Sequence, residues 1–174
     1  QARSVFLCLP GNGTSPHLSA ELFKLMTGVR MTHVPYKGAG PALIDLVGGQ
    51  VGVYFGSLPA TMPSVRSGKL RVLAATGLKR SALAPELSTV AEAGVPGFES
   101  MQWYGVLAPA GTPQAIVTKL HTDMVAAITA QDIRKHLVDL GISTIANSPR
   151  EFSDVIRNDM ARWGKLIRSL ERQK

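Results

Sequence analysis

Cysteine is almost absent, because Cys8 is the only one among 174 residues. A single thiol cannot form a disulfide within the chain, so the cysteine count does not define the compartment. Cys8 lies in an apolar stretch, which predicts a buried hydrophobic residue. Metal-ligand spacing is also missing, since the histidines are far apart and no Cys-x-x-Cys occurs. We therefore expect no metal site. The histidines are His17, His33, His121 and His136.

Long apolar runs and aromatic residues are scarce as well. No run approaches the roughly 20 apolar residues of a membrane span, and residues 1–10 are too short and too weakly basic for a complete signal peptide. Aromatic residues make up 6%, and Lys and Arg form no stripe interleaved with them. The net charge of +7 therefore suits a solvated basic surface or the steering of small anions, and we expect no nucleic-acid partner.

Known catalytic and nucleotide-binding motifs are absent. Gly-x-Ser-x-Gly does not occur, and the turn at 11–15 lacks the Gly-Lys-Thr/Ser of a Walker loop. In a dinucleotide fingerprint, a third glycine would stand where this chain has Pro16. No general base or metal set accompanies the turn, so the sequence predicts no catalytic residue, no cofactor and no enzyme activity.

A strand, a loop with glycine and a helix follow one another three times, and 45% of the residues are hydrophobic. This order predicts an α/β fold with a parallel sheet and a packed core. The expected strands are 4–9, 29–35 and 50–55, and the helices after them run from about Leu18 to Gly28, from Pro41 to Gly48 and from Ser57 to Gly68.

The loops after these strands meet at one edge of a parallel sheet. A glycine turn at a helix start leaves N–H groups unpaired beside the positive end of the helix dipole, which predicts an anion site. Thr14 and Ser15 either cap the helix or donate hydroxyl groups, and the turn alternatively serves only as a tight connection. His17 either holds the loop by a hydrogen bond or contacts a ligand. Tyr36 and Lys37 either contact the anion or are a packed ring beside a solvated charge.

The remaining chain predicts further elements. They are a strand at 70–76, a short helix opened by the capping box Thr89–Glu92, an extended stretch at 98–107, a helix capped by Thr112 with Pro113 first, a helix at 132–140, a strand at 143–146, and a long helix opened by the capping box Ser148–Glu151.

Six strings together resemble one family. They are GNGTSPHLSAELF at 11–23, VPYKG at 34–38, PALIDLVGGQV at 41–51, GKLRVLA at 68–74, TVAEAGVPGF at 89–98 and WYGVLAPAGTP at 103–113. From about Gly11 to its C-terminus, the chain is similar to the solute receptors of tripartite tricarboxylate transporters, the TctC or Bug-type periplasmic binding proteins.

The resemblance implies a type II periplasmic-binding-protein-like fold. Residues 1–104 would be a ligand-binding lobe with a parallel-rich sheet, and residues 105–174 would be C-terminal helices of the other lobe. The ligand implied is a small organic anion: a di- or tricarboxylate, an amino acid or an aromatic acid. A membrane permease would be the second partner, and the location would be periplasmic if the chain is exported. The implied ligand-binding residues are Asn12, Gly13, Thr14, Ser15, His17, Tyr36, Lys37, Gly38, Gly56 and Ser57.

The sequence departs from the family in three ways. Residues 1–10 do not resemble the small-residue strand that usually precedes Gly-x-Gly-Thr, and the other two departures change the expectations above. The first half of the family fold has no counterpart, so we expect a homodimer through the helices at 113–129 and 149–170, or a poorly stable chain. Gly56 and Ser57 stand where the family often has Asp-Asn, which weakens the expectation of an amino-bearing ligand. The alternative to a binding protein is an oligomeric interaction module that binds no solute.

Overall fold

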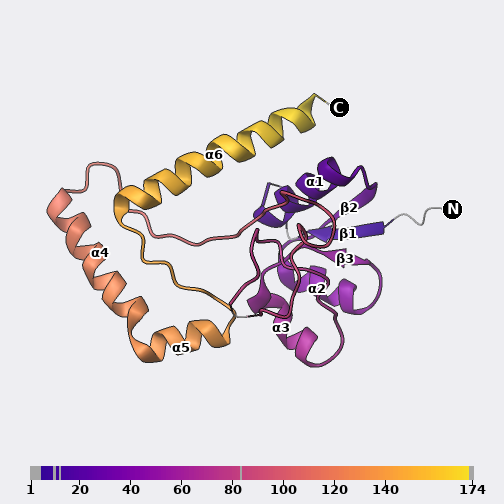
Figure 1. The fold of residues 1–174 in the computed structure, drawn as a ribbon, viewed down its shortest axis with the longest axis horizontal. Helices are drawn as coiled ribbons and strands as arrows, with labels where there is room; N and C mark the ends of the chain where they lie inside the picture. Colours follow the sequence, from indigo (N-terminus) through magenta and orange to yellow (C-terminus); the bar gives the residue numbers. More distant parts are fainter. Residues whose placement is uncertain (1–4, 10, 12, 83, 173–174) are drawn as a thin grey trace. The chain divides into compact units, whose positions relative to one another are not determined.

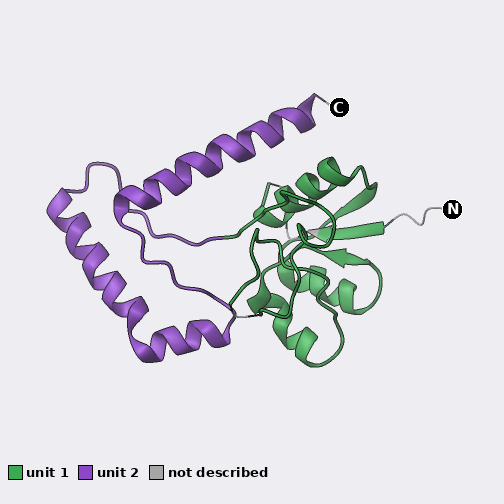
Figure 2. Cartoon of the chain, viewed as in Figure 1, with its two compact units in different colours: residues 1–102 green, residues 103–174 purple. Residues whose placement is uncertain are grey.

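The computed structural model describes residues 5–9, 11, 13–82 and 84–172. The chain divides into two compact units, residues 1–102 and 103–174 (Figure 2). The boundary follows Gln102, where the sequence predicts one after Tyr104. Each unit is described below by itself.

Unit 1 is built on a parallel sheet (Figure 1). Strand β1 (Val5–Leu9) lies between β2 (Met31–Pro35) and β3 (Val53–Tyr54), in the order β2-β1-β3. Both pairs are parallel, as the repeated strand–loop–helix pattern predicts. The third strand is shorter than the predicted 50–55, because a turn still holds Gln50, whose amide donates to Asp45 O at 2.9 Å.

A helix follows each strand: α1 (Ser15–Thr27), α2 (Ala39–Val47) and α3 (Leu58–Arg66). Leu7 and Cys8 point to opposite faces of β1, as neighbours in a strand do. Leu7 packs with Ala20 of α1, and Cys8 packs with Ala42 of α2. The two helices therefore cover opposite faces of the sheet.

Cys8 is buried, as predicted. Its thiol donates a hydrogen bond to Val53 O at 3.5 Å. Burial raises the pKa of this thiol to about 11, so Cys8 is a protonated, unreactive core residue at neutral pH.

The prediction of a strand at 70–76 is wrong. In this segment only Ala75 forms a bridge, with Thr89. The Ala75 amide donates to Ser88 O, and the Val90 amide donates to Ala75 O, both at 2.9 Å. A strand needs a continuous partner, and a single loop position supplies only one pair of bonds.

The predicted short helix after Thr89 does not form either, although its capping box does. The Thr89 amide donates to Glu92 Oε2 at 2.9 Å, and the Glu92 amide donates to Thr89 Oγ1 at 3.1 Å. Gly94 then takes a φ of 115°, and Pro96 follows. Both end a helix at its first turn.

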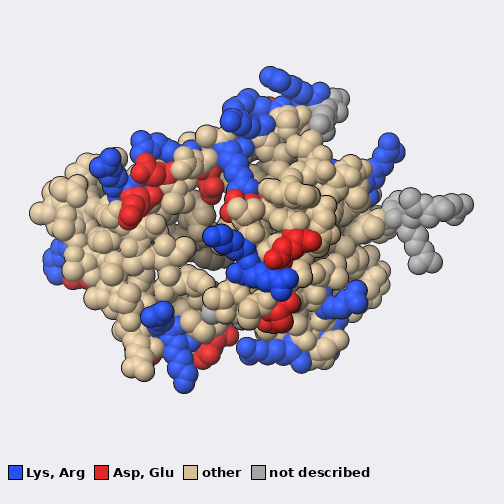
Figure 3. Space-filling view, viewed as in Figure 1, with Lys and Arg blue, Asp and Glu red and all other residues tan. Residues whose placement is uncertain are grey.

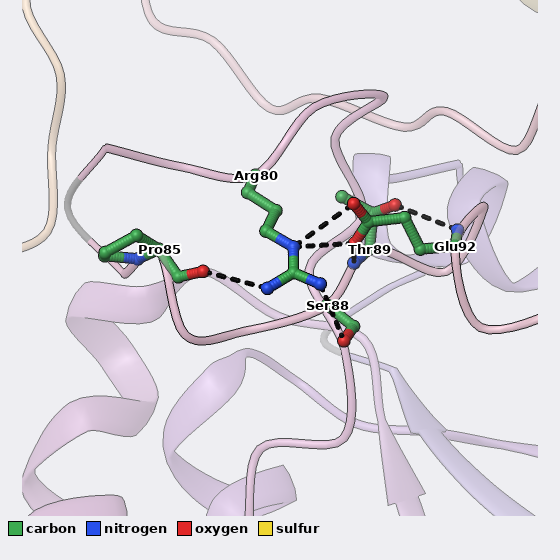
Figure 4. A network of polar contacts seen from close by, with 5 residues as sticks. All are labelled: Arg80, Pro85, Ser88, Thr89 and Glu92. Atoms are coloured by element: carbon green, nitrogen blue, oxygen red, sulfur yellow. Dashed lines mark hydrogen bonds and ion pairs between the residues drawn. The ribbon is translucent and has the colours of Figure 1, made fainter.

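Arg80 joins this region in one network of hydrogen bonds (Figure 4). Its Nε donates to both Glu92 oxygens at 2.9 and 3.1 Å, Nη1 donates to Pro85 O at 3.1 Å, and Nη2 donates to Ser88 Oγ at 3.4 Å. The hydrogen bond from the Thr89 amide and the contact with Arg80 lower the pKa of Glu92. The network therefore joins Arg80, Pro85, Ser88, Thr89 and Glu92 on the surface.

The end of unit 1 docks on α1. Phe98 is fully buried and meets Phe23 of α1 edge to face, with ring centroids 6.0 Å apart. Ser100 Oγ lies 2.5 Å from the buried Ser19 Oγ, which itself donates to Ser15 O at 2.8 Å. Because Ser19 has one hydroxyl proton and uses it on Ser15, Ser100 is the donor to Ser19.

Unit 2 contains α4 (Gln114–Thr129), α5 (Gln131–Asp139) and α6 (Pro149–Glu171). The predicted capping box of α6 is confirmed, with Ser148 and Glu151 bonded reciprocally. The predicted cap of α4 is wrong: the capping residue is Pro113, because the Thr112 hydroxyl donates to Pro109 O at 2.8 Å instead.

Only Ala130 separates α4 from α5, whereas residues 140–148 connect α5 to α6. The predicted strand at 143–146 is absent from the described residues, because no neighbouring strand pairs with it. Trp103 Nε1 donates to Asp159 Oδ2 of α6 at 2.6 Å, and its ring meets Phe152 edge to face at 5.2 Å. In the described part of the chain, we find no helix with the length and hydropathy needed to cross a membrane.

Candidate functional site at three helix starts

Three loops of unit 1 lie at the same edge of the sheet. Leu9 pairs with Pro35, and Cys8 pairs with Tyr54, so the three parallel strands end side by side. The loops that lead into α1, α2 and α3 follow directly. The convergence expected of the loops 11–15, 36–40 and 56–57 is therefore present in the structure.

The three helices also share an open N-terminus. The capping residues are Thr14, Gly38 and Ser57, and none makes a side-chain cap hydrogen bond. None of these helices has an acidic residue in its first turn. The first amides of a helix have no intrahelical partner and carry the positive end of the dipole. The edge thus presents three sets of positively polarised N–H groups, without the cap that Ser148 gives to α6.

The first loop is shaped by Gly13 and Thr14. Gly13 has a φ of 75°, which favours glycine, and its amide donates to His17 Nδ1 at 2.9 Å. The hydroxyl of Thr14 donates to Gly11 O at 2.8 Å. It therefore neither caps α1 nor stays free to donate, which corrects both interpretations of Thr14. The hydrogen bond from Gly13 confirms that His17 holds the loop.

The other two residues predicted at the first loop are Ser15 and Asn12. Ser15 is exposed and begins α1, so it is a residue of the first turn and not the cap. Asn12 lies outside the described residues.

The second loop contains Tyr36, Lys37 and Gly38. Tyr36 Oη donates to Asp45 Oδ2 at 2.6 Å, and this bond, with the charge of Asp45, raises the pKa of Tyr36 to about 12. The Tyr36 hydroxyl proton is therefore already used. Lys37 is exposed and forms no ion pair within the described chain. Gly38 has a φ of 109°, a conformation that lets the chain turn into α2.

The third loop contains Gly56 and Ser57. A Cβ atom at Gly56 would lie 2.0 Å from the Tyr54 ring, so a side chain there would displace that ring. Ser57 begins α3 as its capping residue. Its carbonyl accepts from Thr61 Oγ1 at 3.2 Å, while its own hydroxyl makes no cap bond.

Two partners of the site residues are not evident from the sequence. Asp45 binds Tyr36 from the next helix, nine positions along the chain. His33 of β2 stacks on His17 of α1, with ring centroids 4.9 Å apart. Only the parallel pairing of β1 and β2 brings these two histidines together, and spacing along the chain gives no signal of it.

The edge offers backbone N–H groups at three helix starts. No group of three His, Cys, Asp or Glu side chains suited to a metal occurs among the described residues. On the face drawn in Figure 3, Lys and Arg side chains are scattered and interspersed with Asp and Glu.

The partly buried His33 makes the stability of the protein sensitive to pH. Burial, then the charge of His17, lowers the pKa of His33 below 6.5. The unfolded chain therefore takes up a proton at a pH where the folded chain does not, and the free energy of unfolding falls as the pH drops through about 6.5. We expect urea unfolding to show this loss between pH 7.5 and 5.5.

The variant His33→Phe keeps a ring against His17 but does not titrate. It is expected to lose less stability over the same pH range. An equal loss in both proteins would show that other groups cause it.

Solved structures share this fold. The protein Rpa4515 of R. palustris, solved with adipate, superposes with a TM-score of 0.87 at 41% identity over 95% of this chain and 56% of that one. The periplasmic binding protein BugD gives 0.83 at 31% identity, over 95% of this chain and 56% of that one. MatC from Rhodopseudomonas palustris, with bound malate, gives 0.80 at 31% identity, over 94% of this chain and 56% of that one. The fold is that of a periplasmic binding protein.

The sequence then assigns the family. The model of the tripartite tricarboxylate transporter family receptor, TctC, matches residues 4–171, so the chain belongs to this family. The match includes β1 and so begins earlier than the resemblance from Gly11 indicates. The family is one of solute-binding proteins. The chain spans about half the length of most of the curated relatives it matches.

Proposed function

We propose that this chain binds a small carboxylate at the three helix starts of unit 1. The observation that carries the proposal is the absence of side-chain caps on α1, α2 and α3, which begin together at one edge of the sheet. A carboxylate there would accept hydrogen bonds from unpaired amides and meet the positive ends of the helix dipoles. Adipate and malate in the two solved relatives support this class of ligand.

The residues proposed to contact the ligand are those of the three loops. Gly13, Ser15, Gly38 and Gly56 would allow close approach or offer amides, and Lys37 would add a positive charge. His17 and Tyr36 would act through the loops they hold, since one bonds Gly13 and the other bonds Asp45. The hydroxyl of Ser57 makes no cap bond, so it is a candidate donor.

The receptor family and its periplasmic members support a role in transport. We propose that the chain acts in the periplasm, where it would deliver its carboxylate to the membrane permease of a tripartite tricarboxylate transporter, without changing it chemically. Unit 1 would be the lobe that holds the ligand, and unit 2 would belong with the other lobe.

A thermal-shift screen tests carboxylate binding directly. Adipate, malate, succinate, citrate, glutamate and benzoate are each added in increasing concentration. A ligand that binds the native state at 100 times its Kd stabilises it by about 2.7 kcal/mol, so at least one dicarboxylate is expected to raise Tm by several degrees and saturably. Methyl esters of the same acids are the matched controls, because they keep the carbon skeleton without the charge. A flat response to all six acids would contradict the proposal.

A second candidate is an oligomeric module that binds no solute. Apolar side chains exposed on α4 favour it, among them Ile116, Leu120 and Met124. Large exposed apolar faces usually meet a partner, which here would be the same helices of a second copy. Light scattering distinguishes this homodimer from a monomer, and a dimer that gives no thermal shift with any acid would favour this candidate over the first.

A further inference from the structure

The hydrogen bond at His17 fixes the position of its proton. The Gly13 amide is a donor, so His17 Nδ1, at 2.9 Å, is the acceptor. An imidazolium ion has N–H groups at both nitrogens and cannot accept. In this structure His17 is therefore neutral, with its proton on Nε2.

The groups around His17 come from two elements. Nε2 faces Glu21 Oε1 on the same helix at 3.8 Å, and Lys24 Nζ holds that same carboxylate at 2.8 and 3.1 Å. From β2, the His33 ring stacks on His17, and His33 Nε2 is buried without a partner in the described chain. The charge of His17 lowers the pKa of His33, so the two rings do not readily carry protons together.

The described residues before α1 make two hydrogen bonds that involve side chains, Gly13 N–H to His17 Nδ1 and the Thr14 hydroxyl to Gly11 O. The Leu18 amide also donates to Thr14 O at 3.0 Å. Gly13 has open space where a Cβ would be, so no packed side chain replaces the His17 bond when it is lost.

We propose that His17 is a positioning residue whose neutral form holds Gly13, so that proton uptake at His17 releases Gly13 and weakens carboxylate binding. The effect on binding rests on the proposed function, whereas the effect on the loop does not. Protonation converts the Nδ1 acceptor into a donor, which then faces the Gly13 N–H. The two donors repel, the glycine turn loses its fixed conformation, and a ligand that binds must order it again.

Nuclear magnetic resonance of the full chain without ligand tests the loop. The ¹⁵N signal of His17 Nδ1 is expected to be that of an unprotonated nitrogen near pH 8. The Gly13 amide proton is expected to shift upfield as the pH is lowered, in step with the change of the His17 Nδ1 signal. A proton on Nδ1 at pH 8, or a Gly13 amide that does not follow His17, would overturn the proposal.

Two variants distinguish the effect of losing the hydrogen-bond acceptor at His17 from the effect of protonating its ring. In His17→Asn the side-chain oxygen takes the place of Nδ1 and accepts from Gly13 without titrating, whereas His17→Leu removes the acceptor. We expect the Gly13 amide to keep its high-pH position at all pH values in the first variant and to lose it at all pH values in the second. His33→Phe should retain the wild-type titration of Gly13, because His17 remains.

Adipate affinity, measured by calorimetry from pH 8 to 6, tests the consequence. Wild type and His33→Phe are expected to lose at least threefold in affinity relative to His17→Asn, whose own change over this range measures the protonation of adipate itself. An equal loss in His17→Asn, or tighter binding by wild type at low pH, would overturn the coupling. If Gly13 follows His17 but none of the carboxylates binds to any variant, the proposed function fails and the role of His17 in the loop stands.

Discussion

Replacing Ser15 by aspartate is expected to weaken carboxylate binding at least about tenfold and to leave the fold as stable as the wild type or more stable. Ser15 is exposed at the first position of α1. An acidic side chain in the first turn interacts favourably with the helix dipole, by about 0.3–1 kcal/mol. The same charge would repel a carboxylate a few ångströms away. A tenfold loss corresponds to only about 1.4 kcal/mol, which one like charge at a partly exposed site can supply.

The Ser15→Asp result is easy to interpret, because affinity is expected to fall while stability is expected to stay the same or rise. A variant that lost affinity because it unfolded would also have a lower Tm. Ser15→Asp is not expected to lower Tm. Ser15→Asn is the matched control, since it has the same shape without the charge and should bind nearly as well as wild type. Adipate calorimetry and thermal unfolding are measured on all three proteins. If aspartate and asparagine bind alike, the ligand does not sit at the start of α1.

Replacing Phe98 by alanine is expected to cost about 3–5 kcal/mol of unfolding free energy. Phe98 has no exposed surface and meets Phe23 of α1 edge to face. The loss combines the apolar transfer of a whole ring, the cavity left behind and the ring pair itself. Such a change is a large part of the stability of a domain, so Tm should fall by many degrees.

Urea unfolding measures the Phe98→Ala effect, with Leu73→Ala as the control. Leu73 belongs to the same region of unit 1 but is 68% exposed, and its truncation is expected to cost less than about 0.5 kcal/mol. Similar small losses in both variants would mean that residues 75–100 do not pack on α1. Because Ser15 begins α1, the Phe98→Ala protein should also bind adipate more weakly wherever it remains folded.

Unit 1 follows closely from its sequence where local signals and topology agree. Glycines in the loops and the periodicity of apolar residues predict the three strand–loop–helix repeats. Parallel pairing of the strands then brings these loops to one edge of the sheet. The capping box at Ser148 predicts the start of α6, because both hydrogen bonds form within four residues.

The wrong predictions concern segments whose structure depends on a distant partner or on competition between local hydrogen bonds. A strand at 70–76 needs a neighbour, and the sequence does not show that only Thr89 is available to Ala75. Thr14 and Thr112 are good capping residues by type, yet each donates its hydroxyl to a carbonyl three residues earlier. Residue type identifies a hydroxyl that can bond, whereas the path of the loop selects its acceptor.

The candidate site also combines features that the sequence predicts with features that it does not. The glycine turn predicts open amides at a helix start, but the loss of one of them to His17 Nδ1 depends on a side-chain rotamer. The bond between Tyr36 and Asp45 also crosses a loop, so it appears only once α2 is in place. Which of the ten predicted contact residues touch a ligand remains a prediction for the experiments above.

The uncapped starts of α1, α2 and α3 also bear on how long the protein survives. Helix ends without caps fray, and a chain that opens locally is cut by proteases in proportion to how often it opens. An occupant at this edge would close three fraying ends at once. With a carboxylate bound as proposed, the chain should therefore outlast its empty form during proteolysis, so the supply of solute would help to set how much of the protein is retained.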